Sequence, residues 1–309
     1  MPIVRELDLV EKTLKDAVGS DIDVLAQIGA YVFEAGGKRL RPKVVLLSYK
    51  AVGGMDAVQA VPLAAVVELL HTASLIHDDI NDSSALRRGQ ETINTRWGNN
   101  LAILAGDFIF IQILSLMASF EPSVIKLLAE CCSAAVEGET LQMINRGNTE
   151  MSEELYLEIV SKKTACIFSA CAKTGGILAA GTERDVATLG EYGFNLGMAF
   201  QIRDDALDLV GDIQFLGKPT FTDIGQGTMN LVTLFAIRKL EEAREVLLSE
   251  KRNAAQAKQL LRDTGALDYA VQRAEMYAHK AKKALSSLPE SDAKTSLHEL
   301  ADFAVARNQ

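Results

Sequence analysis

The sequence predicts an all-α protein, and three observations support this. No proline occurs between Pro122 and Pro219, so long helices can run through this span without interruption. Apolar side chains recur there at three- and four-residue spacing, as in Leu127, Leu128 and Cys131, which is the period of a helix with one buried face. No alternating apolar and polar run ends in an Asn-Gly or Asp-Gly turn, so nothing indicates a β-sheet.

Glycine and proline divide the chain into about ten or more helices. Breaks are expected at residues 35–37, 52–54, 121–122, 180–182, 216–219 and 288–289, where these residues end or begin helices. Residues 240–283 have a charged amphipathic pattern, which predicts surface helices. Because no linker or low-complexity tract separates these elements, residues 1–309 are expected to form a single-domain bundle.

The charge and the cysteines limit the possible partners. A formal net charge of -9 argues against nucleic acid or anionic membrane as partners, since either needs a basic surface. No uncharged apolar stretch approaches the roughly 20 residues that span a bilayer, so the chain is not expected to cross a membrane. Without metal-type spacing, the cysteines are expected to be reduced core residues of a cytoplasmic protein, at Cys131, Cys132, Cys166 and Cys171.

A first acidic cluster follows the apolar stretch 69–76 and consists of Asp78, Asp79 and Asp82. Asp78 and Asp82 are four residues apart and share one face of a helix. Close carboxylates repel each other, and a bound cation is the natural compensation at the end of a buried helix. The alternative is a charged helix end in solvent, and the first cluster alone leaves both interpretations open.

The same arrangement recurs as Asp204, Asp205 and Asp208 after another apolar run. Two such clusters are much less easily explained as coincidence. Carboxylates without a His or Cys cluster suit magnesium, which binds a few carboxylates and leaves its other positions to water and phosphate. The sequence therefore predicts a magnesium site, in which two clusters clamp one diphosphate.

Basic groups occur where a diphosphate needs them. Residues 36–42 place Lys38, Arg39 and Arg41 beside two glycines, and Arg87 and Arg88 follow the first acidic cluster. Arginine forks onto phosphate oxygens. The alternative for each segment is a set of surface charges beside a turn.

With these segments the sequence resembles the trans-isoprenyl diphosphate synthases, which include farnesyl, geranylgeranyl and longer-chain polyprenyl diphosphate synthases. The resemblance covers nearly the whole chain. It rests on ordered motifs, namely GGKRLRP at 36–42, LLHTASLIHDDINDSSALRRG at 69–89, LAGDF at 104–108, GET at 138–140 with Gln142, Lys163-Thr164, and FQIRDDALD at 200–208.

The resemblance implies a homodimer with the isoprenoid synthase fold, whose helices surround a central apolar cavity. It implies Mg²⁺-dependent 1'-4 condensation of isopentenyl diphosphate with an allylic diphosphate, with three ions in the substrate complex. The expected magnesium ligands are Asp78, Asp79, Asp82, Asp204, Asp205 and Asp208.

The resemblance also assigns substrate contacts. Arg87 and Lys163 are expected to contact the allylic diphosphate, while Gln201 and Thr164 line the reacting centre. The diphosphate of isopentenyl diphosphate is expected to be held by Lys38, Arg41, His71 and Arg88. Taken without the family, His71 is better interpreted as a hydrogen-bonded core histidine.

Two departures from the family pattern leave alternatives open. Thr228 stands where the family usually has a lysine, so one phosphate-binding cation is missing, and Phe221 stands where glycine is common. The first change is the only support for a noncatalytic subunit of a heteromeric prenyl synthase. A terpene cyclase is the other alternative, but it has no use for the second diphosphate site that GGKRLRP indicates.

Product length is expected to depend on the helix that precedes Asp78. Ser74 and Ala73 lie four and five residues earlier, roughly 6 to 7.5 Å deeper along the helix at 1.5 Å per residue. Shorter-chain members of the family tend to have an aromatic residue near this level. The small side chains here predict an open tunnel and a product of C20 or longer.

We expect Ala73→Phe to shorten the product, because the ring would block the growing chain at this level. Chromatographic sizing of the products made by the wild-type and variant chains measures the effect. Identical product lengths would place the tunnel floor elsewhere, at Leu70 or on the helix that contains Phe108 and Phe110.

Overall fold

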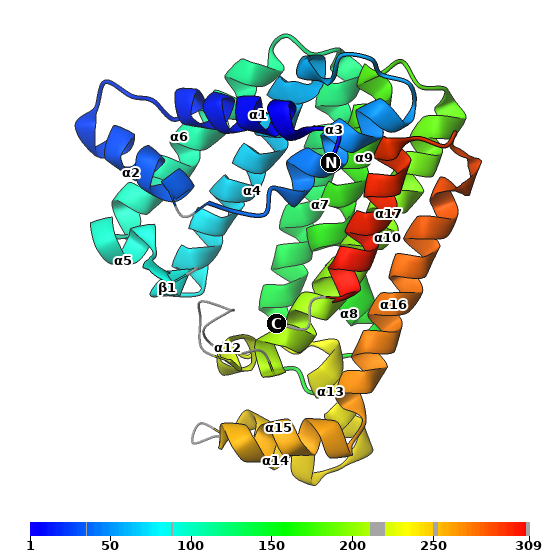
Figure 1. The fold of residues 1–309 in the computed structure, drawn as a ribbon. Coiled ribbons are helices and arrows are strands. Elements are labelled where there is room, and N and C mark those ends of the chain that lie inside the picture. The colour runs from blue at the N-terminus through cyan, green and yellow to red at the C-terminus, as the bar shows by residue number, and fades with distance from the viewer. Residues whose placement is uncertain (35, 88, 211–219, 250–252, 307–309) are drawn as a thin grey trace. The chain divides into compact units, whose positions relative to one another are not determined.

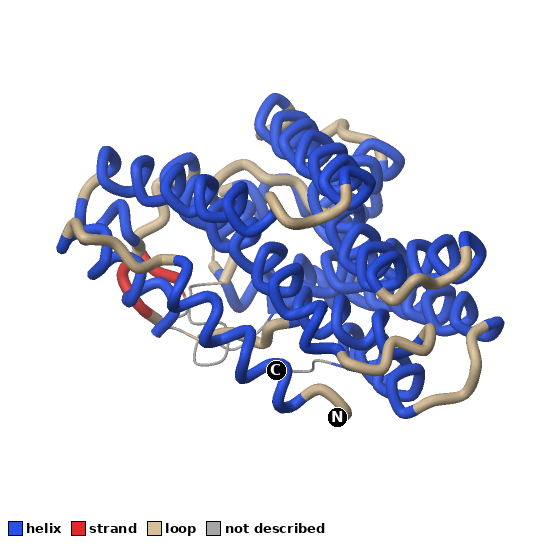
Figure 2. Tube along the Cα trace, turned by 90° about the horizontal axis from the view of Figure 1, so that it is seen from above, coloured by secondary structure: helices blue, strands red, loops and turns tan. Residues whose placement is uncertain are grey.

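The computed structural model describes residues 1–34, 36–87, 89–210, 220–249 and 253–306. Within these residues the regular structure is almost wholly helical (Figure 1, Figure 2), so the all-α prediction is confirmed. The chain divides into unit 1, Met1–Leu127, Cys171–Leu189 and Leu288–Leu297, and unit 2, Leu128–Ala170, Gly190–Ser287 and His298–Gln309. The single domain expected from the sequence stays a prediction.

Unit 1 is built around one long apolar helix, α4. Its helices are α1 (Val4–Ala17), α2 (Asp23–Glu34), α3 (Leu40–Ala51), the short 3₁₀-helix η1 (Ala57–Ala60), α4 (Val61–Asn81), α5 (Ile93–Trp97) and α6 (Asn99–Met117). α4 packs against α6, α3 and α1 and buries Leu63, Leu69 and Ala73 completely. A helix that is apolar on most of its faces is stabilised by burial, here against its neighbours in the core. The first acidic cluster therefore lies at the carboxyl end of a buried helix.

Unit 1 also contains a short β-hairpin that the sequence analysis did not predict. Strands β1 (Leu86–Arg87) and β2 (Gln90–Glu91), red in Figure 2, pair antiparallel. Leu86 lies opposite Glu91. Gly89 adopts a φ of 77°, which glycine allows without steric cost in a tight turn. Strands of two residues are too short to show an alternating pattern, so no periodicity indicated them.

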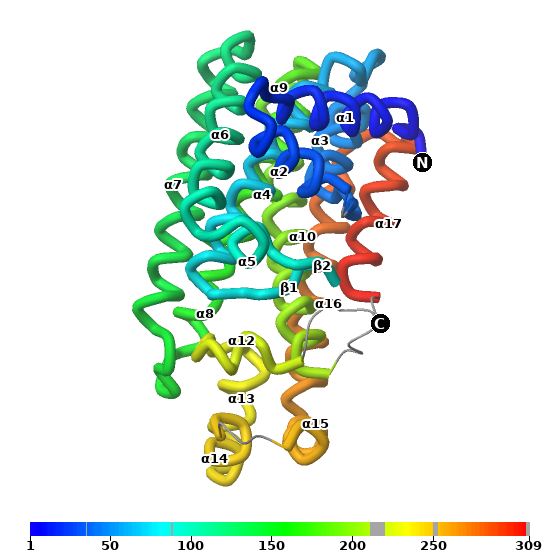
Figure 3. Tube along the Cα trace, turned by 90° about the vertical axis from the view of Figure 1, so that its left-hand side faces the viewer, coloured from blue at the N-terminus to red at the C-terminus, as the bar shows by residue number. Residues whose placement is uncertain are grey.

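Unit 2 is a second helical core. It contains α8 (Glu153–Val160), the π-helix η2 (Ser161–Ala165), α12 (Thr222–Gly225), α13 (Leu231–Lys239), α14 (Glu242–Leu248), α15 (Ala254–Asp263), α16 (Ala266–Ala284) and the 3₁₀-helix η3 (Leu285–Ser287). α13 packs on α16, and α14 and α15 contact each other (Figure 3). The face that α16 buries is a row of small residues, Ala266, Ala270, Ala274, Ala278 and Ala281. The amphipathic pattern of residues 240–283 thus gives helices with one buried face, as predicted.

Four helices contribute residues to both units, namely α7 (Pro122–Ile144), α9 (Cys166–Leu178), α10 (Glu183–Val210) and α17 (Asp292–Ala306). α7 with 23 residues and α10 with 28 confirm the long helices predicted for the proline-free span. The expected breaks at 121–122 and 180–182 fall where α7 and α10 begin. The break expected at 216–219 lies outside the described residues.

Two helical segments are long and apolar enough to cross a membrane, residues 57–81 and 99–117. No such span was expected from the sequence, because each stretch contains charged residues, such as Glu68 and Asp107. Most of the first segment is buried inside the structure, and most of the second is not. A core helix of a globular protein meets the same criteria, so these segments alone do not indicate a membrane protein.

Candidate active site

The first acidic cluster occupies the end of α4. Asp78 and Asp79 lie in its last turn, and Asp82 follows as the C-cap, with its backbone N–H donating to the Asp78 carbonyl at 2.8 Å. The carboxyl end of a helix carries partial negative charge. Three carboxylates at this position therefore oppose both one another and the helix dipole, and they need positive charge close by.

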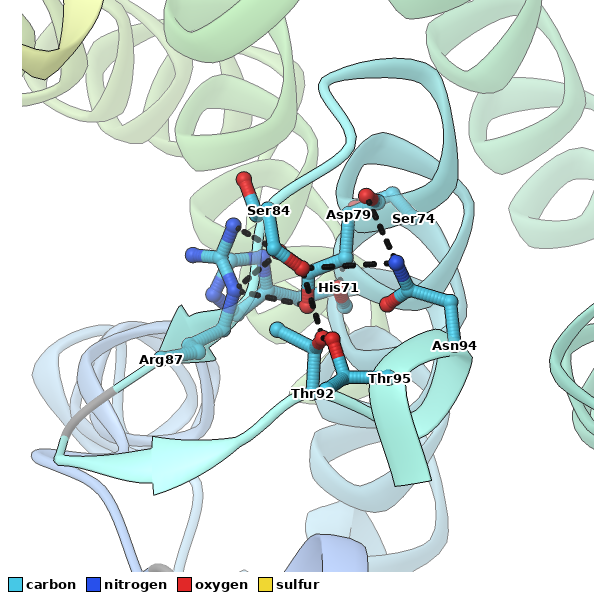
Figure 4. Close-up of polar contacts among 8 residues, drawn as sticks. All are labelled: His71, Ser74, Asp79, Ser84, Arg87, Thr92, Asn94 and Thr95. Carbon is cyan, nitrogen blue, oxygen red and sulfur yellow. Dashed lines mark hydrogen bonds and ion pairs between the residues drawn. The ribbon is translucent and has the colours of Figure 1, made fainter. Parts of the chain in front are cut away.

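Part of that charge comes from Arg87 on β1. The Arg87 Nε donates to both oxygens of Asp79, at 2.8 and 3.0 Å, and Nη2 donates to Oδ1 at 2.6 Å (Figure 4). Asp79 is 5% exposed, and burial raises the pKa of its carboxyl although Arg87 acts in the opposite direction. The arginine expected to contact the allylic diphosphate is thus held here by the cluster's second aspartate.

Hydrogen bonds from polar side chains hold the segment that contains the hairpin against the end of α4 (Figure 4). The Thr92 hydroxyl donates to the Ser84 carbonyl at 2.6 Å, and the Asn94 amide donates to the carbonyls of Asp79 and Ser84 at 3.4 and 3.3 Å. These residues were not expected from the sequence. Ser, Thr and Asn are common in loops because they bond neighbouring backbone, so their type alone gave no distinguishing signal.

Beside the cluster, unit 1 contains a hollow that opens to solvent. α2, α4 and the hairpin line it, and its wall includes His71, Asp79 and Arg87. The structure therefore brings these three predicted residues together. Its lining is Tyr31, Val32, Phe33, Arg39, Glu68, His71, Thr72, Leu75, Ile76, Asp79, Arg87, Gln90, Glu91, Thr92 and Ile93.

The other residues predicted in unit 1 differ in their surroundings. Lys38 is exposed just before α3, and Arg41 is half-buried in its first turn. Ala73 is completely buried, whereas Ser74 is half-buried and its hydroxyl donates to the His71 carbonyl at 2.9 Å. Arg88 lies outside the described residues.

The second acidic cluster occupies the last two turns of α10, within unit 2. The Gln201 amide donates to Asp205 Oδ1 at 2.7 Å, and the Thr164 hydroxyl donates to Gln201 Oε1 at 2.9 Å. The Tyr156 hydroxyl of α8 donates to Asp205 Oδ2 at 2.7 Å. The structure thus joins Asp205 and the two residues predicted at the reacting centre in one chain of hydrogen bonds.

Tyr156 is a member of this chain that the sequence analysis missed. It is almost fully buried, and burial with the neighbouring Asp205 charge raises its pKa well above the ordinary value. Its partner Asp205 lies 49 residues away in the sequence, so no local pattern pointed to it. The buried phenol therefore remains a hydrogen-bond donor to Asp205.

Asp205 itself is a perturbed carboxyl. Burial, followed by the negative charge of Asp223, raises its pKa from 3.8 to about 7, and the hydrogen bonds from Tyr156 and Gln201 only partly oppose this. The carboxylate form of Asp205 is therefore unfavourable in the protein alone, and a nearby cation would stabilise it.

Lys163 lies in the π-helix η2 and forms an ion pair with Glu139 of α7. Gly138 permits this approach, because a Cβ there would lie 2.6 Å from the Lys163 backbone nitrogen. The adjacent Lys162 pairs with Glu137 at 2.6 Å. The Gly-Glu pair of the GET motif thus brings α7 against the lysine expected to contact the allylic diphosphate.

The backbone conformation at Phe221 gives a reason for the glycine that is common at this position in the family. Its backbone is left-handed, with φ of 63°, and its N–H donates to the Asp208 carbonyl at 2.9 Å. Glycine adopts this conformation without a penalty, whereas for other residues it costs roughly 1–2 kcal/mol. The position therefore needs the backbone that glycine provides most easily, and Phe221 is 4% exposed there.

Both acidic clusters offer the hard oxygen donors that magnesium prefers. Among the described residues, no group of three or more His, Cys, Asp or Glu side chains is arranged to hold a metal ion by itself. Magnesium usually takes one or two protein carboxylates and completes its shell with water and substrate phosphate. The donor set therefore fits a metal that binds together with a diphosphate.

Comparison with known proteins gives concordant results. The family model described as polyprenyl synthetase matches residues 22–264. A short chain isoprenyl diphosphate synthase of Methanothermobacter thermautotrophicus is 37% identical over 99% of this chain and 98% of its own length. An octaprenyl diphosphate synthase of Escherichia coli is 35% identical over 97% of this chain and 95% of its own length.

A solved structure is similar over almost the whole chain. It is a polyprenyl synthase from Caulobacter crescentus, complexed with calcium and isoprenyl diphosphate. Its TM-score is 0.94 at 35% identity, and the match covers 99% of this chain and 96% of that one.

We predict that Asp205→Asn stabilises the metal-free protein at pH 8 relative to pH 4. The pKa of Asp205 is raised to about 7 in the folded protein, whereas in the unfolded chain it stays near 3.8. Between these two pH values Asp205 is ionised in the unfolded chain but protonated in the folded protein, so the stability of the wild type falls as pH rises from about 4 to 7. The asparagine removes that loss. Thermal unfolding by circular dichroism in EDTA should show the Tm difference, variant minus wild type, becoming more positive at pH 8.

Asp16→Asn on the exposed surface of α1 is the control for removing one negative charge. Any hydrogen bond that the introduced asparagine fails to make is lost at both pH values, so only the change with pH is diagnostic. A Tm difference that is the same at pH 4 and pH 8 would contradict the assignment.

Proposed function

The chain belongs to the polyprenyl synthetase family, and we propose that it condenses isopentenyl diphosphate with an allylic diphosphate in magnesium-dependent 1'-4 chain elongation. The product is a trans-polyprenyl diphosphate of C20 or longer. The observation that carries the proposal is the pair of acidic clusters, each at the carboxyl end of a long helix and each with its second aspartate held by protein donors.

The acidic clusters are proposed to bind the allylic diphosphate through magnesium. Bound magnesium would stabilise the negative charge that gathers on the departing diphosphate. Arg87 and Lys163 add two cationic side chains for the same group, and Asp79 and Glu139 fix their positions. The similar polyprenyl synthase solved with calcium and isoprenyl diphosphate supports a divalent ion beside this ligand.

The reaction needs no side-chain nucleophile. The allylic carbon–oxygen bond breaks, its electron pair leaves with the diphosphate, and an allylic cation remains. The double bond of isopentenyl diphosphate attacks that cation, and a proton is lost to the departed diphosphate. Gln201 and Thr164 are proposed to line this centre, where apolar walls exclude the water that would capture the cation.

The second substrate is proposed to bind through Lys38, Arg41, His71 and Arg88. The hollow in unit 1 supports this for His71, which lies in its wall. On chain length, the proposal of C20 or longer rests on the small side chains of Ala73 and Ser74 in the sequence, and Ala73 is packed in the core. The names of the relatives range from short chain to octaprenyl synthases, so they do not select one length.

The purified chain alone, supplied with magnesium, labelled isopentenyl diphosphate and an allylic primer of C5, C10, C15 or C20, should give products longer by multiples of five carbons. Thin-layer sizing after dephosphorylation measures them. Asp78→Asn should lower turnover about 100-fold or more, because it removes charge stabilisation at the leaving group.

Asp16→Asn removes an exposed carboxylate from α1 and should leave turnover unchanged. Lack of elongation from every primer would contradict the proposal and favour a noncatalytic subunit. A hydrocarbon formed from the allylic diphosphate alone would instead identify a terpene cyclase.

We also propose a homodimer, which an apolar stripe on α6 supports. Leu104, Ile111 and Leu114 are spaced seven and then three residues apart, share one face of the helix, and are 56%, 60% and 64% exposed in unit 1. Ile103 and Phe110 flank them, also exposed. Contiguous exposed apolar side chains of this size mark an interaction surface.

Ile111→Asp combined with Leu114→Asp should convert the protein from twice its 33.5 kDa chain mass to the single-chain mass in sedimentation velocity, because it places two charges in the interface. Ile22→Asp, at another exposed apolar site of unit 1, is the control. A wild-type chain that sediments as a monomer would contradict the dimer.

A further inference from the structure

Arg39 is one of three cations in the segment 36–42, but its surroundings differ from those of the other two. It is 8% exposed. Its Nε and Nη2 donate to the two oxygens of Glu11 on α1, at 2.5 and 3.0 Å, and Nη1 donates to Glu68 of α4 at 3.0 Å. The guanidinium is therefore committed to two carboxylates of the protein and is not a candidate contact for substrate.

The backbone fixes where this guanidinium lies. Arg39 is the N-cap of α3 in the left-handed conformation, with φ of 49° and ψ of 43°, and its carbonyl accepts the Lys43 N–H at 3.0 Å. The Phe33 ring lies 5.7 Å from the guanidinium carbon. The side chain is thus held by the helix start on one side and by an aromatic ring on another.

Glu68 is the partner with consequences for ligand binding. It is 4% exposed, and its side chain lies in the wall of the unit 1 hollow, together with Arg39 and His71. His71 is one helical turn from Glu68. A buried carboxylate without a counter-charge is strongly unfavourable and would repel an anion placed beside it. Burial acts to lower the pKa of Arg39, but Glu11 and Glu68 together raise it, so the guanidinium stays charged.

We propose that Arg39 is a positioning residue for the homoallylic diphosphate, which acts through Glu68 by neutralising a carboxylate in the wall of that site. This rests on the proposed function. Arg39 does not touch the diphosphate; it keeps the wall near His71 from opposing it. Glu11 on α1 forms the second ion pair with Arg39 and holds the guanidinium in position.

The test uses the full chain and four variants. Arg39→Gln should raise the KM for isopentenyl diphosphate about tenfold, equivalent to 1.4 kcal/mol, with kcat and the KM for the allylic primer nearly unchanged. Arg39→Lys keeps the charge and should restore most of the affinity. Glu68→Gln alone should bind isopentenyl diphosphate at least as tightly as wild type, and Arg39→Gln with Glu68→Gln should recover the affinity lost in Arg39→Gln.

Arg5→Gln, at an exposed position of α1, is the matched control for loss of one positive charge. Thermal unfolding of each variant sets a temperature at which all are folded. If Arg39→Gln does not fold, Arg39→Lys and the charge-balanced double variant still test the proposal. A merely structural role predicts that both KM values and kcat worsen together and that the double variant is no better than Arg39→Gln.

Calorimetric titration of isopentenyl diphosphate separates this inference from the proposed function, because binding requires no turnover. Recovery of binding in the double variant supports the role of Arg39 even if no primer is elongated. Three results would overturn it: equal affinity in wild type and Arg39→Gln, no recovery on neutralising Glu68, or no binding of isopentenyl diphosphate by the wild-type chain.

Discussion

A carboxylate held against an apolar interior needs a hydrogen-bond donor or a cation beside it, and this requirement organises the candidate functional residues within each unit. Several acids of the site have such a partner within the same unit. The pairs are Asp79 with Arg87, Glu68 with Arg39, Asp205 with Tyr156 and Gln201, and Glu139 with Lys163. The proposed chemistry follows from this pattern, because the same carboxylates and cations suit a metal-bound diphosphate.

The second aspartate of each acidic cluster has a structural role that sequence alone did not separate from the others. Asp79 accepts from Arg87 through both oxygens, and Asp205 accepts from Gln201 and Tyr156. These bonds fix the helical turns that carry the remaining aspartates of each cluster. Preorganised groups of this kind lose little freedom when a charged ligand binds, which is the advantage of placing them on helices packed in a core.

The sequence predicted the helices well because apolar periodicity and proline position act locally, as the long α7 and α10 illustrate. It missed the hairpin, whose strands are too short to show a period. From the sequence, the three cations of GGKRLRP could not be distinguished from one another. The burial of Arg39 depends on Glu11 and Glu68, which lie 28 and 29 residues away, and such long-range pairing leaves no local signal. Tyr156 was missed for the same reason, since its partner Asp205 is 49 residues away.

The proposed activity depends on recognition of an allylic diphosphate by the acidic clusters through magnesium. Calorimetric titration of the chain with an allylic thiodiphosphate, whose carbon–sulfur bond resists ionisation, measures this recognition without turnover. We expect binding in magnesium that weakens about tenfold or more in EDTA, and a smaller magnesium effect in Asp78→Asn. Equal affinity with and without magnesium would contradict it.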